Sequence, residues 1–88
     1  MSVLARLSVS GMTTDSYDKV SEHLTPPLLA AAGFVAHVAF EADGEFHVSE
    51  IWESRDDFQN WFDNNVTPNV PGVKVDVVTE VHNVIIKK

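Results

Sequence analysis

The sequence predicts an α+β domain whose elements follow in the order β-α-β-β-α-β, with four strands in one antiparallel sheet. Three observations support this prediction. Apolar residues alternate as in strands in four segments, they recur at helical spacing in two others, and an Asp43-Gly44 pair separates two of the strand segments. The 88 residues leave room for one domain, residues 1–88.

The first strand and the first helix are predicted from the first third of the chain. In residues 3–9 every second residue is apolar, which indicates a strand. Thr13 or Thr14 can cap a helix over residues 15–24, whose apolar residues recur at spacings of three and four. The following Pro26-Pro27 pair is expected to end this helix, because proline lacks the amide hydrogen that continues it. Residues 28–33 allow one further short helical turn.

A hairpin is predicted next, with strands over residues 34–41 and 46–53. An Asp-Gly pair between such segments favours a two-residue turn. That turn places three pairs of residues opposite each other, which are His37 and Glu50, Val35 and Trp52, and Ala39 and Val48.

The last part of the chain predicts a second helix and a fourth strand. Ser54 can cap a helix that runs from Arg55 to Val66, with apolar residues on one side. The fourth strand is expected over residues 73–81, and the apolar tail at residues 83–88 either extends it or pairs with a partner. The resulting order is that of a ferredoxin-like fold.

Two helices can cover only one face of a four-stranded sheet. We expect the uniformly apolar side of each strand to face the helices. The opposite face then carries seven residues of interest, Arg6, Val35, His37, Val48, Glu50, Trp52 and Val78. Apolar walls with a few polar groups are typical of a binding chamber, which a second copy packed on this face would enclose.

The hairpin has an alternative register, in which a three-residue turn with a bulge shifts the pairing by one residue. That register would turn Glu50 and Trp52 toward the helices. We prefer the two-residue turn, because the alternative buries the Glu50 carboxylate beneath a helix.

Size and composition also predict a homodimer. A chain this short buries only about 60% of its unfolded surface, so disulfides, metals or self-association usually stabilise it. Cysteine is absent, which excludes disulfides and thiolate metal sites. The net charge of −7 argues against nucleic acid and anionic membranes as partners. Without a long apolar segment or a signal-peptide pattern, a soluble cytoplasmic protein is expected.

Two motifs resemble those of the dimeric α/β-barrel proteins, and among these the antibiotic biosynthesis monooxygenase (ABM) family. The first motif is Gly33-Phe34-Val35-Ala36-His37, where the second strand begins. The second is Glu50-Ile51-Trp52-Glu53-Ser54, which is followed by Phe58 and Trp61-Phe62. The resemblance covers nearly the whole chain and points to the fold more clearly than to a reaction.

The resemblance implies a homodimer with an apolar cavity in each protomer. Enzymes of this family oxidise polycyclic phenols or quinols with molecular oxygen, without metal or flavin. Other members degrade haem, cyclise or rearrange polyketide-like substrates, or have no known activity. The haem-degrading members use an asparagine on the first strand and a histidine from the second helix. Here the first strand offers Arg6 and Ser8, and the second helix has no histidine, so haem degradation is not expected.

His37 is the leading candidate for a catalytic residue. It interrupts an apolar strand, and an imidazole can act as a general base near neutral pH. Glu50, across the hairpin, can hold the imidazole tautomer and raise its basicity. In an oxygenase this base would convert a phenol into an anion that reacts with oxygen, and in a cyclase it would form an enolate. The alternative is a structural His–Glu pair, which is the commoner role.

The remaining candidates are substrate-binding residues. Trp52 could stack on a flat ligand, although large aromatic side chains more often serve packing. Arg6 could bind a carboxylate or an oxyanion, or pair with an acidic residue of the fourth strand. Val35, Val48 and Val78 would supply an apolar wall. Tyr17 is expected to pack in the core, with its hydroxyl within reach of a cavity mouth.

No metal or cofactor is expected, because the sequence has no compact metal-ligand spacing, phosphate-binding loop, nucleophile elbow or dinucleotide fingerprint. Three functions remain open. The leading one is a cofactor-independent monooxygenase that acts on an apolar aromatic or polyketide-like molecule. The second is a cyclase or isomerase that uses the same base without oxygen. The third is a non-catalytic, ligand-binding or stress-related dimer.

Overall fold

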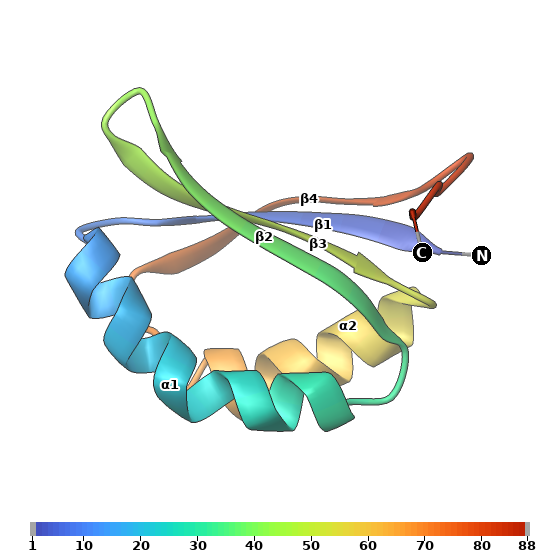
Figure 1. Ribbon diagram of the computed structural model, residues 1–88, viewed down its shortest axis with the longest axis horizontal. Helices are drawn as coiled ribbons and strands as arrows, with labels where there is room; N and C mark the ends of the chain where they lie inside the picture. The colour runs from blue at the N-terminus through green and yellow to red at the C-terminus, as the bar shows by residue number, and fades with distance from the viewer. Residues whose placement is uncertain (1, 88) are drawn as a thin grey trace.

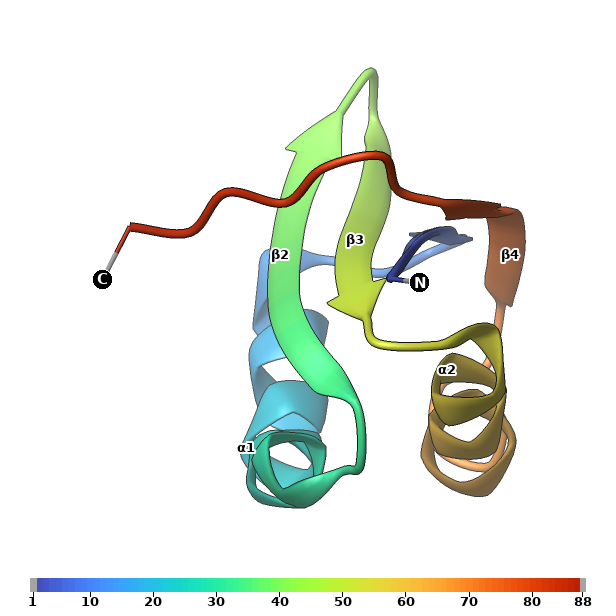
Figure 2. The ribbon, with the colours of Figure 1, turned by 90° about the vertical axis from the view of Figure 1, so that its right-hand side faces the viewer.

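The computed structural model describes residues 2–87, which form a four-stranded antiparallel sheet with two helices on one face (Figures 1 and 2). The elements are β1 (Val3–Val9), α1 (Thr14–Ala30), β2 (Phe34–Ala42), β3 (Glu45–Trp52), α2 (Arg55–Trp61), the π-helical turn η1 (Phe62–Val66) and β4 (Val73–Glu80). The strands lie side by side in the order β2-β3-β1-β4. The predicted ferredoxin-like order of elements is confirmed.

Both helices begin at capping residues expected from the sequence. The Thr13 hydroxyl accepts a hydrogen bond from the backbone N–H of Ser16, and the Ser16 hydroxyl accepts one from the N–H of Thr13. Ser54 caps α2 in the same way by accepting from the N–H of Asp57. These bonds satisfy amide groups that have no partner within the helix.

Helix α1 does not end at Pro26 and Pro27, contrary to the prediction, and both prolines lie inside it. The hydrogen bonds that prolines cannot make would have involved the carbonyls of Glu22 and His23, residues on the exposed side of the helix. Water can satisfy both carbonyls there. The axis of α1 turns midway along its length in Figure 1, as expected for prolines inside a helix. Burial of Leu28 against the core stabilises the turn that follows.

The hairpin has the predicted two-residue turn, in which Asp43 and Gly44 both have positive φ angles (54° and 77°). The predicted pairing of His37 with Glu50 is confirmed. Farther from the turn, Phe34 and not Val35 pairs with Trp52, because the register shifts at a bulge between Phe34 and Ala36. The bulge brings Phe34 and His37 to the same side of the sheet.

The predicted orientation of the hairpin relative to the helices is wrong. The alternate β1 residues from Val3 to Val9 are buried against the helices, as expected. Residues directly paired on neighbouring strands share a face. Five residues therefore lie on the helix-covered face, namely His37, Val48, Glu50, Trp52 and Val78. A chamber between two sheets therefore cannot contain them.

Two features explain this reversal. The more apolar side of β2 faces away from the helices, and its Val38 is 57% exposed. Glu50 is buried beneath the helices, where the sequence argument excluded it, because its carboxylate has hydrogen-bond partners there. The core around it lies between the sheet and the helices and is centred on Trp52, Phe58 and Trp61.

The opposite face of the sheet has no helix over it (Figure 2). It carries apolar side chains from all four strands, including Leu4, Val38, Ile51 and Val77. The tail does not extend β4, which ends at Glu80, so that part of the prediction is wrong. Residues 81–87 instead run across the end of the sheet toward β2 in Figure 2, and Ile85 is 87% exposed. Among the described residues no helix is long and apolar enough to cross a membrane.

Candidate active site

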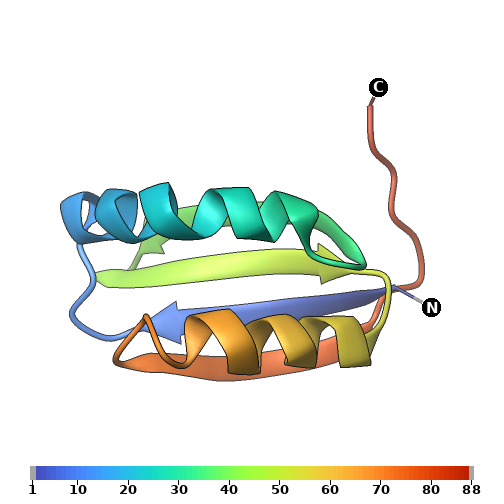
Figure 3. The ribbon, with the colours of Figure 1, turned by 90° about the horizontal axis from the view of Figure 1, so that it is seen from below.

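A cavity of about 100 Å³ lies between the helix-facing side of the sheet and helix α1. Residues of β1, of η1 and of the segment that leads into β4 also line this cavity. Figure 3 shows the two helices running side by side across this face. The wall is mostly apolar, and its hydroxyl, imidazole and carboxyl groups belong to five residues, Tyr17, Ser21, Thr25, His37 and Glu50.

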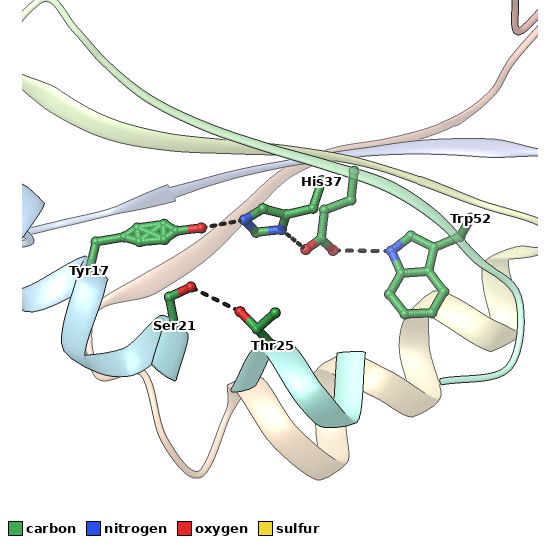
Figure 4. Close-up of polar contacts among 6 residues, drawn as sticks. Tyr17, Ser21, Thr25, His37 and Trp52 are labelled. Atoms are coloured by element: carbon green, nitrogen blue, oxygen red, sulfur yellow. Dashed lines mark hydrogen bonds and ion pairs between the residues drawn. The ribbon is translucent and has the colours of Figure 1, made fainter. Parts of the chain in front are cut away.

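A chain of hydrogen bonds joins Tyr17, His37, Glu50 and Trp52 (Figure 4). The Tyr17 hydroxyl oxygen lies 2.7 Å from His37 Nε2. His37 Nδ1 lies 2.6 Å from Glu50 Oε2, and the Trp52 indole N–H donates to Glu50 Oε1 at 3.0 Å. An ionised carboxylate only accepts, so the network assigns the proton of the neutral imidazole to Nδ1. His37 Nε2 is then the basic nitrogen, and it accepts from Tyr17.

Local structure places each member of this chain. Tyr17 belongs to the first turn of α1, which the Thr13 cap initiates, and its ring packs edge-on against Phe46 at a centroid distance of 5.0 Å. His37 lies on β2, two residues after the bulge, and faces Glu50 across the β2–β3 ladder. Trp52 follows on the same side of β3 as Glu50. The residues therefore come from three elements held by one helix cap, one bulge and one strand register.

The burial of Glu50 sets the electrostatics of the site. Its side chain is 5% exposed, whereas that of His37 is 24% exposed. Both carboxylate oxygens have partners, and among residues 2–87 no buried side-chain nitrogen or oxygen lacks one. A proton accepted at His37 Nε2 would give an imidazolium hydrogen-bonded through Nδ1 to this carboxylate. The pair is thus built to accept a proton from the cavity side.

The Tyr17 hydroxyl is held in its neutral form. Burial raises the pKa of Tyr17 above its ordinary value of 10.0, and the negative charges of Glu50 and Asp18 act in the same direction, partly offset by the Ser21 hydroxyl. A protonated phenol can donate to His37 while its oxygen accepts from a ligand. Tyr17 is therefore placed to pass a proton onward.

The raised pKa gives a direct prediction, because Tyr17 is the one tyrosine of the chain. We expect its ultraviolet titration to have a midpoint above 10.0 in the folded protein and near 10.0 in urea. Above the unfolded pKa the unfolded chain loses this proton first, so the free energy of unfolding should fall as the pH rises through that range. A folded midpoint at or below 10.0 would contradict the burial of this hydroxyl.

Three of the seven site residues predicted from the sequence line the cavity, and four do not. His37, Glu50 and Val48 line the cavity. Trp52 lies behind Glu50 and is fully buried, which agrees with packing and adds a hydrogen bond that the sequence did not reveal. Val78 packs against the core outside the cavity wall. Its predicted place on the uncovered face is wrong.

Arg6 and Val35 do not belong to the cavity wall. Arg6 is exposed on the uncovered face of the sheet, since its neighbour Ala5 faces the helices. Asp76, an acidic residue of the fourth strand, instead accepts from the Ser8 hydroxyl and contacts Lys74. Val35 lies at the bulge of β2, so it is not opposite Trp52.

Sequence reasoning assigned Tyr17 to packing and missed its bond to His37. The signal was its place on the buried stripe of the first helix, because a buried tyrosine hydroxyl normally has a hydrogen-bond partner. Within residues 2–87 no group of three or more His, Cys, Asp or Glu residues is arranged to hold a metal ion.

Comparison with known proteins identifies the family. The sequence model described as antibiotic biosynthesis monooxygenase matches residues 1–67, about three quarters of the 88 residues. The chain belongs to the ABM family. No curated protein matches the sequence.

Solved structures share the ABM fold over almost the whole chain. A heme-degrading protein from Mycobacterium tuberculosis is 18% identical, with a TM-score of 0.71 over 99% of this chain and 98% of its own. Two structures of SnoaB, a cofactor-independent oxygenase from Streptomyces nogalater, are 11% and 15% identical, with TM-scores of 0.65 and 0.61. They cover 98% of this chain and 97% and 96% of theirs. At these identities the similarity establishes the fold and leaves the substrate open.

Proposed function

We propose that this ABM protein is a cofactor-independent monooxygenase that oxidises a small phenol or quinol with molecular oxygen. The observation that carries the proposal is the Tyr17–His37–Glu50–Trp52 chain, which presents a basic imidazole nitrogen to an apolar cavity. Membership of the ABM family and the fold shared with an oxygenase support this reaction class.

The first step is removal of the substrate's phenolic proton. The substrate hydroxyl donates to the Tyr17 oxygen while Tyr17 donates to His37 Nε2, 2.7 Å away. As the substrate proton moves to Tyr17, the Tyr17 proton moves to His37. This leaves a substrate phenolate, a neutral Tyr17 and an imidazolium that Glu50 stabilises. The raised pKa of Tyr17 favours this relay over storage of a charge on its oxygen.

The second step consumes oxygen. The phenolate transfers one electron to O₂, and the resulting radicals combine to form a carbon–oxygen bond para to the phenolate oxygen. The imidazolium returns its proton through Tyr17 to give a hydroperoxide. Removal of the ring proton at that carbon by His37 then breaks the O–O bond, and hydroxide leaves as water after taking that proton. One phenol and one O₂ yield one quinone and one water, with no other reductant.

The test is conversion of naphthol to naphthoquinone, followed by chromatography and an oxygen electrode. We expect one O₂ consumed for each quinone formed, and no product under nitrogen. Rearranged product under nitrogen would instead identify a cyclase or isomerase. A ligand that raises the melting temperature and is recovered unchanged in air would identify a non-catalytic binder. Either of these results would refute the oxygenase proposal.

We also propose that the enzyme acts as a homodimer through the uncovered face of the sheet. That face and the tail expose Val38, Val77 and Ile85, with no helix to cover them. Light scattering behind a sizing column should give about twice 9.7 kDa, the mass of one chain, since twofold dimers are the commonest assembly. Val38→Glu should shift this mass toward one chain, whereas Glu22→Gln on the exposed side of α1 should not. A mass of one chain at every protein concentration would contradict the dimer.

A further inference from the structure

The cavity wall has an unusual charge balance for a binding site. Among residues 2–87 its one acidic residue is Glu50, and no lysine or arginine contributes to it. Two basic side chains of the described chain make contacts outside the cavity. Arg55 donates to the backbone carbonyl of Val78, and Lys74 contacts Asp76. A ligand in this cavity therefore meets a buried carboxylate whose wall, among the described residues, has no lysine or arginine to pair with a second negative charge.

A substrate with its own carboxylate would bind poorly here. Moving an anion from water to an apolar wall is costly unless a positive charge pairs with it, and a nearby like charge adds repulsion. The hydroxyls of Tyr17, Ser21 and Thr25 can donate hydrogen bonds, but they supply no positive charge. They suit a neutral hydroxyl group, and in Figure 4 Ser21 and Thr25 lie on α1 across from the Tyr17–His37 bond.

The cavity also limits the size of the ligand. Its volume of about 100 Å³ is of the same order as the roughly 150 Å³ of an apolar cavity known to hold one benzene ring. One ring fills this volume, so each further fused ring has to extend beyond the cavity or displace its walls. A rigid ligand of three fused rings has the most surface to place outside the cavity, and we expect it to bind more weakly than a ligand of one or two rings.

We infer that the site selects compact, uncharged phenols of one or two rings and excludes phenols that carry a carboxylate. This inference rests on the proposed function and names the substrate class of the same site. The inference rests on a buried, fully hydrogen-bonded Glu50 in a cavity wall that contains no lysine or arginine among residues 2–87.

Binding measurements on the wild-type protein test this inference without turnover. Titration calorimetry under nitrogen would compare naphthol, its ortho-carboxylated analogue hydroxynaphthoate, and the three-ring anthrol. We expect naphthol to bind at least tenfold more tightly than either of the others. Equal or tighter binding of hydroxynaphthoate would overturn the charge selection, and equal binding of anthrol would overturn the size limit. No binding of naphthol would overturn both.

Glu50→Gln tests the cause of the charge selection, because it removes the charge and keeps the size of the side chain. It should raise the affinity for hydroxynaphthoate at least fivefold and change that for naphthol less. Glu22→Gln makes the same change of net charge on the exposed side of α1 and should leave both affinities unchanged. If both variants changed the affinity for hydroxynaphthoate equally, the discrimination against the carboxylate would come from the net charge of −7 of the whole protein. That result would overturn the role of Glu50. If Glu50→Gln does not fold by circular dichroism, the wild-type comparison still decides the inference.

The binding and turnover experiments fail independently. Selective binding of naphthol without oxidation in air would retain the substrate class and refute the oxygenase. Oxidation of hydroxynaphthoate would retain the oxygenase and refute the substrate class.

Discussion

His37→Gln is expected to lower kcat/KM for naphthol oxidation by about 10²–10⁴, the usual contribution of a general base. Glutamine can still hydrogen-bond to Glu50 and Tyr17, but it cannot take the proton that the phenol must lose. The fold should survive, because the His37 side chain is 24% exposed and lies on the edge strand β2. Steady-state kinetics, with circular dichroism to check folding, would measure both effects.

The matched control for this variant is His23→Gln. His23 is an exposed residue of α1 and lies outside the cavity wall, so its replacement should leave kcat/KM unchanged. Full activity of His37→Gln at neutral pH would remove His37 from the mechanism.

Trp52→Ala is expected to have the largest effect on stability, a loss of about 3–5 kcal/mol in the free energy of unfolding. The side chain is fully buried in contact with the core, and its indole N–H is the partner of Glu50 Oε1. Domains of this size have only about 5–10 kcal/mol to lose. Urea denaturation should therefore show the variant close to unfolding in buffer.

Trp52→Phe separates the hydrogen bond from the packing. It keeps an aromatic ring but leaves one oxygen of the buried carboxylate without a partner, which should cost about 1–3 kcal/mol. Trp61→Phe is the control, since Trp61 is also buried but makes no side-chain hydrogen bond within the described residues. In a double-mutant cycle, Glu50→Gln should lessen the effect of Trp52→Phe and leave that of Trp61→Phe unchanged. Equal effects in both backgrounds would show that the Trp52–Glu50 bond contributes nothing.

The successful sequence predictions relied on local physics. Apolar periodicity, the Thr13 and Ser54 caps and the Asp43-Gly44 turn depend on neighbours a few residues away, and all appear in the structure. The two-residue turn places His37 opposite Glu50 on the neighbouring strand. The central pair of the site was therefore predictable from the sequence. The end of α1 was not, because the cost of two prolines depends on whether water reaches the carbonyls before them.

The sequence alone determined the order of the elements, the hairpin turn and the His37–Glu50 pair. Only the tertiary structure decided which face of the sheet the helices cover. That face determines whether His37 and Glu50 contact a second chain or line a cavity within the same chain. The physical reason is that burial of Glu50 depends on partners distant in sequence. The free-energy cost of burying an isolated carboxylate beneath a helix is too high for a stable fold. This cost is much lower for Glu50, which accepts a hydrogen bond from Trp52 and pairs with His37, itself bonded to Tyr17.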